Sequence, residues 1–241
     1  MAFNNAKNIL VGASPLYVSV KDSTDPTYVE NLLDIPSGGV TFAARTSAAT
    51  TLAASDKVRN VGFTNNGLQI TYNPTYDSVT VDQLLDTAKL FKSAMEVMIA
   101  TEMSEGTLAN VLLVFGQGAS TLRKNNAATT DAYPTKGATG ADDKDLTLGL
   151  EAGALGIQPT ERQLFAVGQA PTLATPVAPA TAELNATTER VYYARRVLSV
   201  QQSQFSLARN TPTTFPVTFR LLPDGNYAGS EYGKIIDRIL A

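Results

Sequence analysis

The sequence contains no cysteine, no histidine and no tryptophan among its 241 residues. Without cysteine, disulfides, thiolate metal sites and thiol nucleophiles are excluded. Without histidine, the chain lacks the usual general base near neutral pH and the commonest metal ligand in proteins. We therefore predict that the chain is not an enzyme and that it has no cofactor, no metal and no catalytic residues.

Charge is also scarce. Charged residues make up 17% of the chain and the formal net charge is -3, against about 25% charged residues in a typical soluble protein. No basic surface for neutralising phosphates is indicated, so we do not expect specific nucleic-acid binding. The low charge, with abundant Ala, Thr and Ser, favours surfaces that contact other protein chains.

Long apolar runs are missing too, and the first residues do not form a basic region followed by an apolar stretch. We therefore expect no membrane span and no secretory signal, and we expect the chain to be made and kept in the cytosol.

The sequence does not match the familiar motifs of nucleotide or metal sites. Gly116-x-Gly118 follows a predicted helix instead of opening one, so it does not match a dinucleotide-binding loop. The acidic run 142–145 lacks the spacing of a calcium loop, and a solvated turn is favoured over a calcium site. Glu161-Arg162 and Glu189-Arg190 are interpreted as surface or interface ion pairs.

Apolar and polar residues alternate along much of the chain, which is typical of strands with one buried face. The strands expected from this pattern lie around residues 16–20, 61–63, 68–72, 191–198, 205–207, 215–221 and 232–240. Asn66-Gly67 predicts a hairpin turn, because both residues tolerate a positive φ. Asp224-Gly225 predicts a second turn.

Residues 84–103 fit either a helix or a strand, and we favour a strand from about Lys89. A short helix is predicted next. Thr107 can cap it, and an apolar stripe follows it, formed by Leu108, Val111, Leu112 and Phe115. Gly116 and Gly118 are expected to end it.

Three segments lack the pattern of a core: residues 37–57, 117–145 and 169–188. Loops beyond about 12–15 residues are uncommon inside a compact domain and are often functional or disordered. We interpret them as arms that become ordered against neighbouring subunits, with surface loops as the alternative. No linker divides the chain, so residues 1–241 are predicted to form a single domain.

Four segments, in order, resemble the major tail tube proteins of tailed bacteriophages. They are ILVGASPLYVSV, VGFTNNGLQITYNPTYDSVTVDQ, SAMEVMIATEMSEGTLANVLLVFG, and TTFPVTFRLLPDGN followed by YGKIIDR. Within them, Val81-Asp82-Gln83 matches a turn of the family, and Glu105, Thr107 and Leu108 match its Glu-x-Thr-Leu sequence before a helix. The resemblance covers most of the chain except the three loops.

This resemblance implies a β-sandwich with one short flanking α-helix and long assembly loops. It implies homohexameric rings that stack into a tube, with sheet edges closing a continuous β-barrel around a channel. DNA and the tape-measure protein would pass through the channel without specific binding, and a tail terminator would be a further partner. The chain would be located in the virion tail, and in the host cytoplasm during assembly.

Two sets of contact residues follow from the resemblance. Residues 37–57 are predicted to form an inter-ring stacking loop, in which Phe42 and Leu52 are apolar anchors and Arg45 is a polar contact. The second set, on one face of a strand, is predicted to line the channel: Lys92, Glu96, Met98 and Glu102. A weakly acidic wall of this kind would repel a passing polyanion. An outer solvent face, or a helix, is the alternative for this second set.

Two other assemblies remain open. The same fold serves as the tube of a contractile injection machine, where a sheath surrounds it. A surface decoration or adhesin-like β domain of a virion would instead form monomers or trimers and bind host glycans or protein through its loops.

Overall fold

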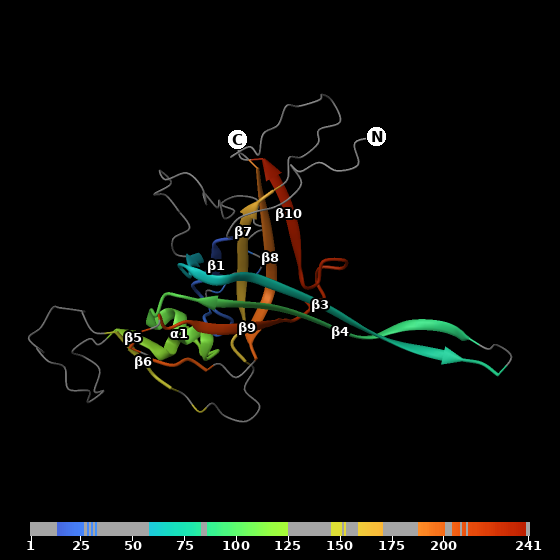
Figure 1. The fold of residues 1–241 in the computed structure, drawn as a ribbon, viewed down its shortest axis with the longest axis horizontal. Coiled ribbons are helices and arrows are strands. Elements are labelled where there is room, and N and C mark those ends of the chain that lie inside the picture. Colours follow the sequence, from blue (N-terminus) through green and yellow to red (C-terminus); the bar gives the residue numbers. More distant parts are fainter. Residues whose placement is uncertain are drawn as a thin grey trace, which may run out of the picture.

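The computed structural model of the chain is mainly β, with one large antiparallel sheet, a small two-stranded sheet and a short α-helix (Figure 1). It describes residues 14–26, 28, 30, 32, 58–82, 86–124, 146–150, 152, 159–170, 188–200, 204–207, 209–210 and 212–239. The predicted fold class, mainly β with one short helix, is confirmed over these residues.

The strands, in chain order, are β1 (Leu16–Ser19), β2 (Val58–Asn60), β3 (Thr64–Thr80), β4 (Thr87–Met103), β5 (Leu122–Lys124), β6 (Leu146–Leu148), β7 (Arg162–Gln169), β8 (Thr188–Ser199), β9 (Phe215–Leu221) and β10 (Gly233–Ile239). The helix α1 spans Leu108–Val114, and a single 3-10 turn follows at Ala119–Thr121. The small sheet consists of β5 and β6.

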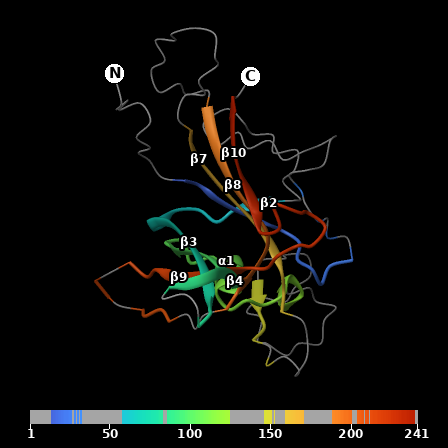
Figure 2. The same cartoon turned by 90° about the vertical axis from the view of Figure 1, so that its right-hand side faces the viewer.

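The large sheet has the strand order β2-β1-β7-β8-β9-β4-β3, and β10 also pairs with β8. Along one edge of β8 lies β7. Along the other edge, β10 pairs with residues 188–194 and β9 with residues 197–199. The sheet therefore divides at β8 into two halves, and Figures 1 and 2 show β3, β4 and β9 running across the direction of β7, β8 and β10.

The main core takes side chains from both halves of the sheet and from α1. Its buried members include Val97, Ile99, Met103, Phe215, Val217 and Phe219 from β4 and β9, Leu16, Val18, Leu164 and Val197 from β1, β7 and β8, and Leu112, Leu113 and Val114 from α1. A second, smaller cluster contains Tyr17, Val58, Phe165, Val191 and Tyr193. Since successive strand residues point to opposite faces, β1, β7 and β8 supply both clusters.

The helix begins and ends where the sequence predicts. The Thr107 hydroxyl accepts a hydrogen bond from the backbone N–H of Asn110 at 3.3 Å, which satisfies one of the free donors of the first turn. Gly116 has a φ of 65° and follows the last turn. The predicted apolar stripe is partly wrong, because Leu113 and Val114 are buried while Phe115 is exposed.

Two strand predictions in this region can be compared with the structure. Residues 87–103 form a strand, so the preference for a strand over a helix is confirmed, and its start lies two residues before Lys89. The hairpin turn predicted at Asn66-Gly67 is wrong. Both residues do have a positive φ, 60° and 69°, but they form a bulge inside β3, opposite the step from Glu102 to Thr101 on β4.

Side chains fix this bulge in place. The Glu102 carboxylate accepts hydrogen bonds from the side-chain amides of Asn65 and Asn66 at 3.3 and 3.0 Å. The Thr101 hydroxyl donates to the carbonyl oxygen of Gly67 at 2.8 Å. A two-residue insertion with a positive φ resembles a hairpin turn in sequence, and only the pairing with β4 distinguishes the two.

Of the predictions for the C-terminal part of the chain, two are confirmed and one is wrong. The turn at Asp224-Gly225 is confirmed, since the backbone N–H of Tyr227 donates to the carbonyl of Asp224 at 3.2 Å. The last strand is confirmed as β10. Residues 205–207 are wrong as a strand, because the described part of this segment has no regular structure.

A buried ion pair joins β1, β7 and the turn after α1. Asp22 has 0% exposure, and its carboxylate accepts hydrogen bonds from Thr24, from the backbone N–H of Ala119 at 2.6 Å and from the Arg162 guanidinium at 3.0 Å. Burial lowers the pKa of Arg162, and the charge of Asp22 opposes this shift. This pair holds the segment after β1 against the body of the protein.

Three charges of the two Glu-Arg dipeptides pair with residues from other segments. Arg162 pairs with Asp22, Glu161 with Arg196 and Arg190 with Asp237. Neighbouring residues of a strand point to opposite faces, so a Glu and an Arg that are adjacent in sequence face different surroundings.

Candidate assembly surfaces

Three of the four residues predicted to line a channel share one face of β4. Glu96, Met98 and Glu102 are partly exposed and lie on the side away from the main core. The residues that alternate with them are buried, namely Val97, Ile99, Thr101 and Met103. The structure therefore brings these three side chains together on a polar face of the sheet.

Lys92 does not belong to this group. Ala94 pairs with Thr75, but Lys92 pairs with Tyr76, so β4 advances two residues where β3 advances one. Such a bulge reverses the alternation of the strand beyond it. The register therefore places Lys92 on the face of Tyr76, opposite to the face of Glu96. A bulge of this kind has no signal in the alternation of the sequence alone.

The charges on the polar face are partly compensated. The carboxylate of Glu96 lies 3.9 Å from the guanidinium of Arg220, which projects from the same face of β9. Both groups are well exposed, so their attraction contributes no more than about 1 kcal/mol to stability. Glu102 is engaged with the bulge of β3. The face therefore carries few charges. Glu96, Glu102 and Arg220 together make two acidic groups and one basic group.

The far ends of β3 and β4 form an arm that projects from the body (Figure 1). We define the arm as Tyr72–Thr80 of β3 and Thr87–Val97 of β4. β9 covers the edge of β4 only from Met98 onward, and among the described residues no third strand pairs with the arm. An isolated two-stranded ribbon is at best marginally stable in water, so the arm calls for a further partner surface.

The arm exposes large apolar side chains, and the most exposed of them share one face; Phe91 and Val79, on the other face, have smaller exposed fractions of 46 and 43%. Tyr72, Tyr76 and Leu90 have exposed fractions of 65, 59 and 65%. Tyr72 is paired with the buried Val97, so this face continues the one that packs into the core. Exposed apolar patches of this kind mark sites of protein association.

The outer edge of β3 is a second candidate surface. Over Thr64–Thr80, the described part of the chain offers no strand that pairs with this edge. Unpaired backbone N–H and C=O groups are a template for a strand of another chain. Pro74 lies in the middle of β3, and proline within a sheet is confined to such edges because it has no N–H.

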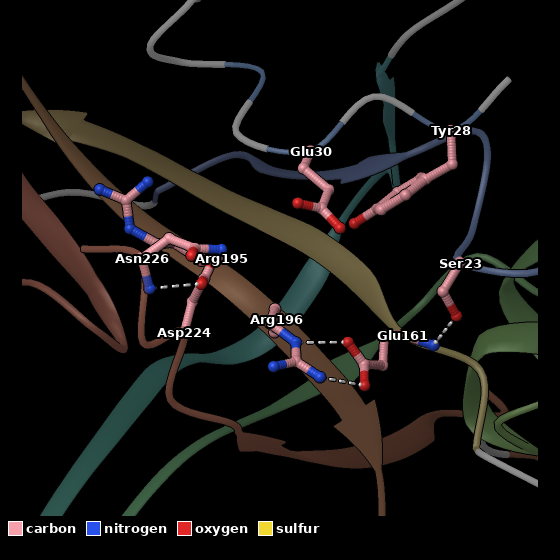
Figure 3. A pocket seen from close by; sticks show the side chains of 8 residues that line it. All are labelled: Ser23, Tyr28, Glu30, Glu161, Arg195, Arg196, Asp224 and Asn226. Atoms are coloured by element: carbon pink, nitrogen blue, oxygen red, sulfur yellow. Dashed lines mark hydrogen bonds and ion pairs between the residues drawn. The ribbon is translucent and has the colours of Figure 1, made fainter.

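A polar cleft of about 340 Å³ lies near the start of β7 (Figure 3). Arg196 forms a two-point ion pair with Glu161 there, with distances of 2.6 and 2.7 Å. Asp224 accepts a hydrogen bond from the backbone N–H of Asn226. Burial raises the pKa of Tyr28 to about 12, so its hydroxyl stays protonated near neutral pH. Arg195 donates to the carbonyl oxygen of Ser230 and lies over the ring of Tyr227. The lining residues form no recognisable acid–base or nucleophile arrangement.

The predicted inter-ring contacts cannot be placed. Residues 37–57, including Phe42, Arg45 and Leu52, lie outside the described residues, as do residues 125–145 and 171–187. These assignments stay predictions.

Sequence reasoning missed the arm and its tyrosines. Alternation from Leu68 to Tyr72 was taken as evidence of an ordinary half-buried strand. The available signal is length: β3 and β4 have 17 residues each, whereas typical strands have about five or six. A hairpin of that length exceeds what a small domain can cover, so part of its apolar face must remain open.

Within the described parts of the chain, no three His, Cys, Asp or Glu side chains come together as ligands for a metal ion. In the same residues, no helix has the length and apolar character needed to cross a bilayer. No family model matches the sequence, and no curated protein matches it either.

Proposed function

We propose that the chain is a structural, non-catalytic subunit of a phage tail tube, forming hexameric rings that stack around a DNA-conducting channel. The observation that carries this proposal is the arm. It has one strand partner for each strand, an open edge and two tyrosines more than half exposed. The four segments that resemble tail tube proteins indicate which kind of assembly would cover it.

The open edges and the divided sheet support ring closure. Free backbone groups along Thr64–Thr80 can pair with a strand of the next subunit, which would remove an edge otherwise prone to uncontrolled association. The main core takes side chains from both halves of the sheet, which supports a sandwich-like packing of the two halves as part of this proposal. In this proposal the half with β3, β4 and β9 joins those of neighbouring subunits in a barrel.

The polar face of β4 suits a channel wall. Glu96, Met98 and Glu102 lie beside the polar residues Thr71 and Asn73 of β3. Few charges and small polar groups offer a passing polyanion no strong binding site. The tape-measure protein and tail terminator would be partners in this assembly, which would form in the host cytoplasm and become part of the virion tail.

Negative-stain electron microscopy of the purified chain over a range of concentrations tests the proposal. We expect hollow six-fold rings or stacked tubes at high concentration. Monomers or trimers under all conditions would contradict it and favour a decoration or adhesin-like domain. Tubes that recruit a sheath protein would instead identify the tube of a contractile injection machine.

A further inference from the structure

A second exposed apolar surface lies beside α1. Phe63 has an exposed fraction of 79% and Leu207 of 85%, and Phe115 is also exposed. The rings of Phe115 and Phe205 lie 6.2 Å apart, and those of Phe205 and Phe215 lie 4.8 Å apart. We call the group made of Phe63, Phe115, Phe205 and Leu207 the aromatic patch; Phe215, with an exposed fraction of 6%, packs beneath it as part of the main core.

Backbone contacts join Phe63 to the rest of the patch. Its N–H donates to the Glu105 carboxylate at 3.0 Å, and its carbonyl accepts from the backbone N–H of Ser104. Gly106, which follows Glu105, lies against the ring of Phe215. A Cβ added to this glycine would lie 3.2 Å from that ring. The rings of Phe115, Phe205 and Phe215 form a continuous chain of contacts, and the backbone of Phe63 is linked to it through Glu105 and Gly106. The exposed members therefore lie over a shared apolar base.

The patch and the arm lie at opposite ends of the same hairpin. Phe63 directly precedes the first residue of β3, whereas the arm is formed by the far end of that strand. With a rise of about 3.3 Å per residue, Tyr72 and Tyr76 lie roughly 30 and 43 Å along the strand from Phe63. One molecule therefore cannot fold its arm onto its own patch.

We propose that the aromatic patch receives the apolar face of the arm from a second copy of this chain. This inference rests on the proposed self-assembly and names the contact that produces it. The arm has nine residues of β3 and eleven of β4, and about half of these lie on the face of Tyr72 and Tyr76. One such contact is smaller than a standard interface, so stable assembly would need each copy to make it at both ends. Exposed tyrosines and a leucine would meet exposed phenylalanines and a leucine.

A contact between two different surfaces has a consequence for symmetry. Each copy carries one arm and one patch, so each can bind two neighbours, one at either end. Such head-to-tail contacts generate rings when the rotation closes and filaments when it does not. An arm-to-arm contact would instead end at a dimer.

Nucleic acid is a poorer occupant of the arm. Its described charged residues, together with those at its tip, are four acidic and two basic: Asp77, Asp82, Asp86, Glu96, Lys89 and Lys92. A net acidic arm would repel phosphates, whereas a protein surface such as the patch has no such conflict.

The test mixes two defective proteins. The arm variant carries Tyr72→Ser and Tyr76→Ser, and the patch variant carries Phe63→Ser and Leu207→Ser. Each retains one intact surface. We expect either variant alone to remain monomeric at tenfold above the concentration where the natural chain assembles. An equimolar mixture should form a one-to-one dimer that grows no further, detected by sedimentation velocity.

The outcomes separate the two proposals. If the natural chain assembles and the patch variant assembles equally well, the patch assignment is wrong while the proposed function stands. A mixture that stays monomeric also overturns the contact. If the natural chain never assembles, the proposed function itself fails.

Cross-linking provides a second readout that does not depend on losing assembly. Since the chain has no cysteine, a Ser78→Cys protein, with its thiol on the face of Tyr76, mixed with a Ser104→Cys protein, beside Phe63, can form a heterodimeric disulfide while the proposed contact residues remain. Under mild oxidation we expect this heterodimer to form at least tenfold faster than with Asn73→Cys, which lies on the opposite face of β3. Equal rates would contradict the contact.

Discussion

Replacing Tyr72 and Tyr76 by serine should weaken assembly by about 100-fold while leaving the single chain folded. An aromatic side chain buries on the order of 150–250 Å². At exposed fractions of 65 and 59%, the pair still offers roughly 190–310 Å² for burial. At about 25 cal/mol per Å², this area corresponds to roughly 5–8 kcal/mol as an upper limit.

The loss of association free energy that can be measured will be smaller than this upper limit. Hydroxyl desolvation and side-chain ordering oppose the gain from burial, so we take about 3 kcal/mol per arm contact. Since every 1.4 kcal/mol is a factor of about ten, the association constant should fall by about 100-fold. The free energy of unfolding of the monomer should change by less than about 0.5 kcal/mol, because these positions are exposed.

Sedimentation velocity over a concentration series gives the association constant, and urea unfolding gives the stability. The matched control carries Asn73→Ser and Thr75→Ser, on the same strand but on its other face. We expect the control to assemble like the natural chain. If the tyrosine variant assembles at the same concentration as the control, the arm does not mediate assembly.

Three further results are expected. Asp22→Ala leaves a buried guanidinium without its partner and should lower the free energy of unfolding by about 3–5 kcal/mol; a loss below about 1 kcal/mol in urea unfolding would refute that role. The Arg190 hydrogen bond lowers the pKa of Asp237, so its contribution to stability is present above the ordinary aspartate pKa of about 3.9 and is lost as the pH falls below it. Asp237→Asn should therefore make the free energy of unfolding fall less steeply as the pH is lowered from about 5 to 2. Phe42→Ser with Leu52→Ser should stop elongation of tubes seen by electron microscopy without unfolding the core, and normal tubes would refute the stacking assignment.

The sheet was largely predictable because its strands have one buried face. Alternation identified β1, β8, β9 and β10, and the Thr107 cap with Gly116 identified α1. These features are local: a strand of period two or a cap of four residues contains its own signal. The strand at residues 87–103 was predictable for the same reason.

Features that depend on pairing were not predictable. Asn66-Gly67 carries the signature of a hairpin turn, yet it is a bulge because β4 continues past it. A second bulge places Lys92 on the opposite face from Glu96. The ion pair of Asp22 with Arg162 joins residues 140 positions apart, which no local pattern reveals.

Among the candidate surfaces, one could be predicted from a local sequence pattern and two could not. The face with Glu96, Met98 and Glu102 follows from alternation along one strand. The arm and the aromatic patch do not, because apolar residues in a strand or near a helix are normally buried. Their exposure emerges only when the whole chain has been placed and nothing among the described residues covers them.

Amide hydrogen exchange of the arm tests the central claim most directly. In dilute, monomeric protein the backbone of residues 72–80 and 87–97 should exchange quickly, since a lone ribbon opens readily. In assembled protein, exchange of the same amides should be slower by at least about 100-fold. This factor corresponds to the roughly 3 kcal/mol assigned to the two tyrosines of the contact. Core amides of β7 and β8 should not change. Equal exchange of the arm in both states would contradict the account.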